Sequence, residues 1–584
     1  MELKTFDFLI IGAFVALLLG IGIYSAKSAN KSSSEYFLSG RNMPWWLLGF
    51  SMVATTFSTD TPNLVTDIVR SSGVSGNWVW WAFLLTGLLT VFVFAELWRK
   101  SGVTTDMGFY QLRYGGRPAR FLRRFRALYL GLLFNVLAMS GVTLAAIKIG
   151  QVMLGLDPVV TVVVAGLITA FFSAIGGFKG VIYTDFVLFI AAISGAFGAA
   201  YFLVNEPDIG GLTQLFSHPN VSDKLDLVPS FSNTEALITL FIIPIAVQWW
   251  SSWYPGAEPG GGGYIAQRML AAKDESNAVW ATFFFNIMHY AIRPWPWILV
   301  ALASLIRYPD IASIAAAFPE VTPDKLGNDL AYSAMLTSLP SGLLGLVLAS
   351  LGAAYVSTLS SHLNWGASYL VYDVFVAYKP EASERQKVVV GQISTLLLMA
   401  LSAVVALSLQ NAKQLFDVIL MFGAGTGLLF MLRWFWWRIN AWSEIAAMLV
   451  SGILSISLAF TPLGETLFGA EGLMPGYMQY PFIVLFTTIV WLAVTFLTPA
   501  EEKVLLEGFV KSLDLSGAGW KKFGGKSQST YLRSGIKSML LGCALVYGLL
   551  FAVGKALYGE SLSALILFAI AVAAGLLLRK TLKK

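Results

Sequence analysis

The sequence predicts an all-α protein that crosses a membrane many times. Of its 584 residues, 57% are hydrophobic and only 12% are charged, and the mean hydropathy is +0.70. A soluble domain carries roughly 25% charged residues, so no soluble fold of this length hides so much apolar surface. About fifteen apolar runs reach the length of roughly 20 residues that spans a bilayer. Two of these runs are interrupted by polar residues, proline or glycine.

The apolar runs set the order of the expected membrane spans along the chain. They lie near residues 6–26, 45–70, 77–98, 124–153, 158–178, 181–204, 236–270, 277–306, 338–377, 386–410, 413–439, 441–461, 480–498, 535–556 and 561–579. Several exceed the minimum length, so they tilt or extend beyond the bilayer. The first run has no basic segment before it and no small-residue cleavage site, so we interpret it as a retained helix.

Composition also excludes several kinds of site. The only cysteine is Cys543, and His218, His289 and His362 are scattered, which argues against disulfides and against a zinc or iron centre. The net charge is +6, but the basic residues lie in loops and indicate topology rather than nucleic-acid binding. No nucleophile–base pair stands at membrane depth, so we do not expect an enzyme.

Loop charges predict the orientation of the chain in a cell membrane. The loop 99–126 carries eight basic residues against the single acid Asp106, and the positive-inside rule places it in the cytoplasm. Alternation of the spans then puts the N-terminus outside, and Arg268 and the C-terminus inside. The loops 205–235 and 307–337 are long, lean acidic and lie outside.

The second span is the first of the two interrupted runs. In MVATTFSTDTPNLVTDIV, Pro62 removes a backbone donor, and Asp60 is costly at membrane depth unless it faces water, an ion or a partner. A packed proline kink is the alternative explanation. The seventh span contains YPGAEPGGGG, which cannot continue a helix and is tolerated at depth only where it lines a cavity or packs on protein. A loop between two shorter spans is the alternative there.

The two breaks have corresponding positions, because each opens a set of five spans. Paired broken helices in two halves of a chain indicate a transporter site near the middle of the bilayer. Five is odd, so the second set is inverted relative to the first. The expected organisation is an N-terminal helix and loop (1–44), two repeats (45–205 and 236–439) joined by an extracellular loop (206–235), and additional C-terminal helices (440–584) that include a cytoplasmic linker (499–534).

The ninth span carries a polar face. Ala354, Ser357, Thr358 and Ser361 follow the spacing i, i+3, i+4, i+7, with Ser360 beside them. Hydroxyls and carbonyls suit a hard cation, although small-residue packing explains the same spacing. Asp185, a few residues into another span, is a functional candidate because it is an intramembrane carboxylate, although it could also be a snorkelling acid.

The chain resembles the sodium:solute symporter family over roughly residues 5–460. The resemblance rests on SMVATTFSTD, GGFKGVIYTD, AAYVSTLSSHLN and YFLSGRNMPWW, which are specific together. It implies a five-plus-five inverted-repeat (LeuT-like) core with one N-terminal and about four C-terminal extra helices. It also implies a sodium site formed by the carbonyls of Ala54, Phe57 and Ala354 and the hydroxyls of Ser357 and Thr358. A second sodium site, present in some members, matches Asp185, Ser357, Ser360 and Ser361. We therefore favour two sodium ions, with one as the alternative.

The chain departs from the family pattern at three places. Leu188 stands where the family often has glutamine, the stretch around Trp78, Trp80 and Trp81 lacks the glutamate of sugar carriers, and the PGAEPGGGG insertion is atypical. Solute-binding candidates project from the breaks and the facing helices: Thr59, Asp60, Thr61, Trp250, Tyr254, Glu258, His289, Arg293 and Asp417.

Arg293 bears most on the solute. It either clamps a substrate carboxylate or pairs internally with Glu258, Asp60 or Asp417, and we favour the internal pair. The site is then nearly neutral, which fits a sugar or polyhydroxy compound. We expect a sodium-coupled importer of such a solute, whose partners are the solute, sodium and lipids, with no nucleic acid and no obligatory protein partner. Proton coupling, an amino-acid or organic-acid solute, and a transporter-like sensor remain alternatives.

Overall fold

The computed structural model describes residues 3–29, 38–56, 58–251, 258–410, 412–525 and 530–582, with side chains except at 26–29, 170–177, 412–414 and 418. All regular elements in these ranges are helical, apart from one isolated backbone bridge between Met43 and Ala272. Ten helical stretches are long and apolar enough to span a membrane, and a bent pair adds an eleventh. The prediction of an all-α, multi-pass protein is confirmed.

Most of the spanning helices are continuous. They are α1 (Thr5–Ala29), α10 (Asn135–Leu154), α11 (Pro158–Val204), α16 (Glu275–Ile287) followed by α17 (Pro294–Arg307), α20 (Leu343–Tyr369), α22 (Glu384–Ser408), α25 (Ala441–Phe460), α27 (Gln479–Leu497), α29 (Thr530–Leu557) and α30 (Ser561–Leu582). Where the sequence predicts separate spans at 158–178 and 181–204, the structure has helical backbone throughout α11. Shorter helices are α23 (Ala412–Ala424), α24 (Gly427–Leu432) and α26 (Pro462–Phe468).

The first broken span consists of two short helices. The helix α3 (Trp45–Thr55) ends at the break, and α4 (Asp60–Ser72) begins beyond it. Pro62 is the third residue of α4, and a proline in the first turn removes no hydrogen bond that the helix would otherwise make. Because Asp60 opens α4, its side chain stands at the break, as the interrupted sequence predicts.

The second broken span resumes at α15 (Gly263–Ala271), after α13 (Thr234–Leu237), η7 (Ile238–Ile242), α14 (Ile243–Ala246) and η8 (Gln248–Trp250). Residues 252–257, which include the first three residues of the insertion, lie outside the described residues. Gly260 and Gly261 have φ values of 85° and 81°, a region that glycine adopts without strain. The indole of Trp98 donates to the carbonyl of Gly260, which fixes this turn in place.

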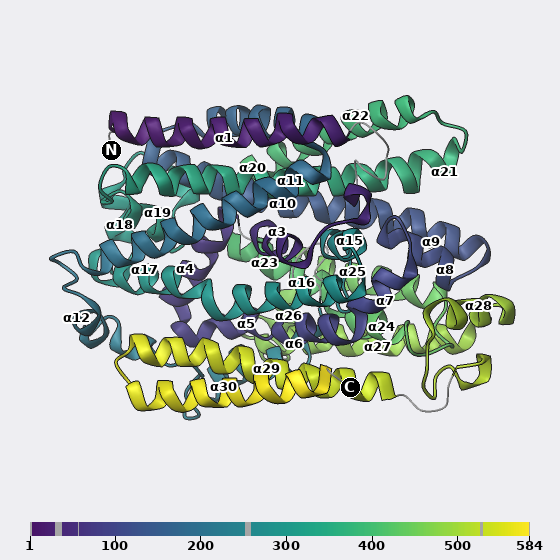
Figure 1. Cartoon of the computed structure of the whole chain (residues 1–584). Helices are drawn as coiled ribbons and strands as arrows, with labels where there is room; N and C mark the ends of the chain where they lie inside the picture. Colours follow the sequence, from purple (N-terminus) through teal and green to yellow (C-terminus); the bar gives the residue numbers. More distant parts are fainter. Residues whose placement is uncertain are drawn as a thin grey trace.

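The loop regions gather at the two ends of the helices (Figure 1). At one end lie α8 (Phe109–Arg113), α9 (Gly116–Leu128), α21 (Val376–Tyr378) and α28 (Lys503–Leu513), and we call this the arginine-rich end. At the opposite end lie α12 (Leu212–Ser217), α18 (Ile311–Ala317) and α19 (Leu330–Leu336). The loops predicted to be cytoplasmic and those predicted to be external are therefore segregated in the fold.

The C-terminal helices α29 and α30 form a hairpin along one side of the molecule, drawn yellow in Figure 1. The helix α29 packs on α6 (Leu84–Leu89) and on the two π-helical turns η3 (Thr90–Phe94) and η9 (Met288–Ile292). Tyr547 of α29 donates its hydroxyl to the carbonyl of Trp81 at 2.9 Å. The hairpin therefore supports the segments that line the central cavities described below.

Three further π-helical turns interrupt the described helices at η5 (Tyr129–Phe134), η7 and η11 (Leu370–Phe375). A π turn accommodates one extra residue in a helix and is frequent at functional sites. The turn η9 carries His289 and directly precedes Arg293, so it sets the direction of two candidate solute-binding side chains.

Candidate solute and sodium site

A buried cavity adjoins the first break, and we call it the outer cavity. It is lined by Thr56, Asp60, Thr61, Leu64, Val65, Trp80, His289, Arg293 and Phe416. Its volume, as the space open to the centre of a water molecule, is about 50 Å³. The structure thus brings together four of the predicted solute-binding residues, Asp60, Thr61, His289 and Arg293.

Arg293 has no carboxylate partner among the described residues within the 4.0 Å limit of an ion pair. Its Nη1 donates to the carbonyl of Val53 at 3.1 Å and to the hydroxyl of Thr56 at 3.3 Å, and its guanidinium lies 5.3 Å from the ring centre of Trp297. Its Nε is buried without a partner. The expected internal ion pair is therefore absent among the described residues: Glu258 binds Arg126 instead, and Asp60 lines the same cavity as Arg293 but forms no ion pair with it.

The sequence did not single out Trp80 and Thr56 as site residues. The Trp80 ring packs edge-on against His289 at 5.7 Å and stacks on Tyr290 at 5.8 Å. The Thr56 hydroxyl lies 3.3 Å from Nδ1 of His289. Thr56 lies at the first break, and this position in the sequence could have identified it as a site residue. Trp80 was noted only for the glutamate missing around it.

Four predicted solute-binding residues lie elsewhere. Thr59 donates to the carbonyl of Val142 at 2.9 Å and faces an apolar cavity between α1, α10 and α20. Trp250 packs against an apolar cluster that includes Ala424 and Ile483, outside the outer cavity. Glu258 lines a separate cavity, and Asp417 is exposed on α23. Tyr254 lies outside the described residues.

Asp185 joins three helices at the position proposed for a cation. Its carboxylate accepts hydrogen bonds from Ser51 at 2.5 Å and Thr55 at 3.4 Å, both on α3, and from Ser357 on α20. Asp185 itself belongs to α11 and is fully buried. The carboxylate therefore ties the first half of the first broken span to the helix that carries the hydroxyl face.

Arg268 lies in the same cluster, which the sequence did not predict. Its Nη2 is 3.4 Å from Asp185, 2.6 Å from the Thr55 hydroxyl and 3.2 Å from the Ser361 hydroxyl. The sequence predicted only that Arg268 lies on the cytoplasmic side, and the structure shows that it is on α15 and 0% exposed. The missed signal was helical spacing. A helix that begins at Gly263 places Arg268 more than one turn into that helix and not in the loop after it.

The remaining predicted sodium ligands are buried on α3 and α20, two helices that pack against each other. Ala54, Ala354, Thr358 and Ser360 are each at most 1% exposed. Phe57 lies outside the described residues. This interface supplies backbone carbonyls and hydroxyls, which are the oxygen ligands that suit a sodium ion.

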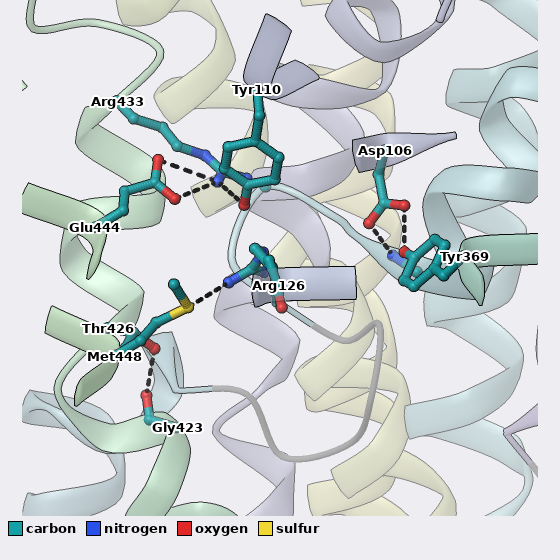
Figure 2. A network of polar contacts seen from close by, with 12 residues as sticks. Asp106, Tyr110, Arg126, Tyr369, Gly423, Thr426, Arg433, Glu444 and Met448 are labelled. Atoms are coloured by element: carbon teal, nitrogen blue, oxygen red, sulfur yellow. Dashed lines mark hydrogen bonds and ion pairs between the residues drawn. The ribbon is translucent and has the colours of Figure 1, made fainter. Parts of the chain in front are cut away.

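A network of buried polar contacts lies toward the arginine-rich end (Figure 2). Arg126 of α9 pairs with Glu258 of the second break. Asp106 accepts from the backbone N–H of Gly263 at 2.8 Å and from the Tyr369 hydroxyl. Arg433 pairs with Glu444 at 3.1 Å. Side chains from several helices therefore hold the second break on the side of the arginine-rich end.

A family model settles the class of protein. The model described as the sodium:solute symporter family matches residues 36–451. The chain belongs to the sodium:solute symporter family. It is accordingly a sodium-coupled symporter with sodium as the co-transported ion, and not an enzyme.

Relatives of this symporter are similar over most of its length. A sodium/glucose cotransporter of Vibrio parahaemolyticus is 26% identical over 513 residues, covering 84% of this chain and 90% of the relative. A sodium/myo-inositol cotransporter of Canis lupus familiaris is 28% identical over 496 residues, covering 78% and 68%. A solved structure of a sodium-coupled sialic acid symporter has a TM-score of 0.66 at 19% identity, covering 86% of this chain and 100% of that one, which supports the LeuT-like core.

Proposed function

We propose that this symporter imports a small polar organic solute, with a sugar or related polyhydroxy compound as the favoured class, and binds it in the outer cavity. The observation that carries the proposal is the gathering of Thr56, Asp60, Thr61 and Arg293 around one buried cavity at the first break. Their hydroxyl, carboxylate and guanidinium groups suit the hydroxyls of such a solute, and Trp80 offers an aromatic face. The printed names of the two relatives agree with this class.

A solute that carries a carboxylate is the second candidate, because Arg293 has no carboxylate partner among the described residues. A planar guanidinium binds a carboxylate through two parallel hydrogen bonds, and its Nε lacks a partner. The carboxylate of an organic acid, an amino acid or a sugar acid would pair with the Arg293 guanidinium. A neutral sugar would satisfy that guanidinium less completely.

Two sodium ions are proposed to accompany the solute. The first binds between α3 and α20, at the carbonyls of Ala54, Phe57 and Ala354 and the hydroxyls of Ser357 and Thr358. The second binds at Asp185 with Ser357, Ser360 and Ser361. Because Arg268 contacts both Asp185 and Ser361, this second ion must displace the guanidinium before it reaches the carboxylate.

The proposed cycle follows from where these ions bind. Sodium at the interface of α3 and α20 stabilises the outward-open state, the solute then binds next to Thr56, and the core reorients inward. A membrane potential of 100 mV contributes about 2.3 kcal/mol per charge moved, so two ions double the voltage-dependent term. The N-terminus is proposed to lie outside and the C-terminus in the cytoplasm. Protease or reporter tags at the two termini test this, and tags on the same side contradict it.

The purified protein tests the proposed function directly. Sugars, polyols, amino acids and organic acids are screened for thermal stabilisation with and without sodium, and hits are measured for uptake into proteoliposomes. We expect stabilisation by a polyhydroxy compound that requires sodium. Stabilisation only by acids favours the second candidate. Uptake that follows an imposed pH gradient and ignores sodium overturns sodium coupling in favour of protons.

A further inference from the structure

A second cavity lies next to the outer cavity and shares Thr56 with it. We call it the inner cavity. It is lined by Thr56, Phe83, Thr86, Gly87, Thr90, Glu258, Gly261, Tyr264, Ile265, Thr282, Phe285, Asn286 and Tyr290. Its volume, measured as for the outer cavity, is about 30 Å³, which is room for on the order of two water molecules. The two cavities therefore meet at Thr56, and the inner one has a mostly apolar lining with a few polar side chains.

Two buried side chains in the inner cavity have unsatisfied polar atoms. The hydroxyl of Thr86 has no hydrogen-bond partner, and the residue is 5% exposed. The side-chain oxygen of Asn286 also has none, and the residue is 0% exposed. The Asn286 nitrogen donates to the carbonyl of Thr282 at 2.8 Å, so the oxygen is the free end. An unsatisfied buried polar group costs roughly 1–3 kcal/mol, which indicates that a ligand or water belongs there.

Two other threonine hydroxyls around the same cavity are already satisfied. Thr90 donates to the carbonyl of Thr86 at 2.9 Å, and Thr282 donates to the carbonyl of Ala278 at 2.8 Å. These bonds lie within their own helices, as is usual for threonine in membrane helices. Thr86 and Asn286 therefore differ from these two threonines, because each has a side-chain oxygen without a hydrogen-bond partner.

Glu258 links the inner cavity to the arginine-rich end. This residue lines the cavity and pairs with Arg126, and both side chains are 2% exposed. The carboxylate is therefore neutralised, and none of the described residues that line the inner cavity is basic. The outer cavity differs, because it presents Arg293 and Asp60. The two spaces offer successive environments of different charge.

We propose that the inner cavity is a second solute-binding site, occupied after the solute leaves the outer cavity and before it is released. It takes hydroxyl groups through the Thr86 hydroxyl and the Asn286 side-chain oxygen, and it expands when Glu258 separates from Arg126. This inference rests on the proposed function, because it assigns a hydroxyl-bearing solute. A neutral polyhydroxy compound fits it, since all the binding groups of the inner cavity are uncharged or neutralised.

The test removes the two unsatisfied groups and follows D-glucose and myo-inositol, the hydroxyl-bearing probes. Thr86→Val and Asn286→Ala are compared with the wild type in proteoliposomes for maximal uptake rate and for the external KM. We expect the maximal rate to fall about fivefold to tenfold, the equivalent of one hydrogen bond of roughly 1 kcal/mol or slightly more. The external KM stays within about twofold, because the outer cavity is untouched. Thr86→Ser keeps the hydroxyl and is expected to restore the rate.

Thr487→Val is the matched control. Its hydroxyl is also buried and without a partner, but it is on α27 and lines neither cavity. An equal loss of rate in Thr487→Val, or unchanged rates in Thr86→Val and Asn286→Ala, overturns the second site and leaves the inner cavity to water. If the wild type shows no sodium-dependent uptake or binding of either probe, the proposed function fails and the second site fails with it. If the wild type takes up a probe and Thr86→Val and Asn286→Ala do so at the same rate, only the second site is overturned and the proposed function stands.

Discussion

The guanidinium of Arg126 pairs with the carboxylate of Glu258, and this pair joins α9 to the second broken span at a point where only 2% of either side chain is exposed. Glu258 lies in the PGAEPGGGG insertion, which is the stretch where the sequence departs most from its family pattern. In this conformation Glu258 therefore pairs with Arg126 at the wall of the inner cavity and does not line the outer cavity.

Glu258→Gln is expected to open the arginine-rich end. Loss of one partner leaves the other charge buried and costs roughly 3–5 kcal/mol, which favours the state that hydrates Arg126. A cysteine at Thr282, in a Cys543→Ser background, reports access from that end through a membrane-impermeant thiol reagent. Labelling should rise several-fold over the parent. Glu444→Gln breaks the neighbouring pair with Arg433 outside the cavities, and equal labelling in that control contradicts a gate role.

Asp185→Asn is expected to reduce the number of sodium ions per solute from two to one. The substitution removes the charge that attracts the second ion but retains a side chain of the same size beside Ser51 and Ser357. Sodium dependence of uptake, fitted for its Hill coefficient, and the reversal potential of the current measure the ratio. A ratio of two in the variant means that the second ion binds elsewhere.

Arg293→Gln is expected to distinguish the two solute classes. If the solute is neutral, loss of one hydrogen bond reduces kcat/KM by about tenfold or less. If it carries a carboxylate, loss of a charge-assisted pair reduces kcat/KM by about 100-fold or more, and Arg293→Lys does not restore it because a lysine lacks the planar fork. Arg307 lies at the end of the molecule opposite the arginine-rich end, where it pairs with Glu206 and Asp208. Arg307→Gln serves as the control and should transport at nearly the wild-type rate.

Lys148→Met is expected to destabilise the protein. Lys148 of α10 pairs with Asp329 at 2.6 Å, and each side chain is 1% exposed, so the variant strands a buried carboxylate at a cost of roughly 3–5 kcal/mol. The double variant Lys148→Met/Asp329→Leu removes both charges and should recover most of the loss in a thermal melt. If the double variant melts at no higher temperature than the single variant, the Lys148–Asp329 pair stabilises the protein by more than the mutual compensation of its two charges.

The sequence predicted the helical class, the two breaks and the clustering of Asp60, Thr61, His289 and Arg293, because hydropathy and helix-breaking residues act locally. It did not predict which charges meet. Arg293 was expected to pair with an acid, while the acid of the second break, Glu258, pairs with Arg126, which lies 132 positions earlier in the chain. Arg268 was expected only on the cytoplasmic side, because a basic residue near the end of an apolar run looks the same in sequence whether it faces lipid headgroups or a buried carboxylate. Only the packing of α3, α11, α15 and α20 together distinguishes these cases.

The π turn η9 makes the number of residues in this helix a determinant of solute recognition. An α-helix advances by about 100° per residue, so deleting one residue from Met288–Ile292 would relax the wide turn and swing Arg293 by that angle away from the cavity. Relatives that differ here by a single insertion or deletion would then present a different side chain to the same space. A single insertion or deletion in this helix can therefore change the substrate preference of the transporter by rotating different side chains toward the cavity, without any change in the kinds of residue that the helix contains.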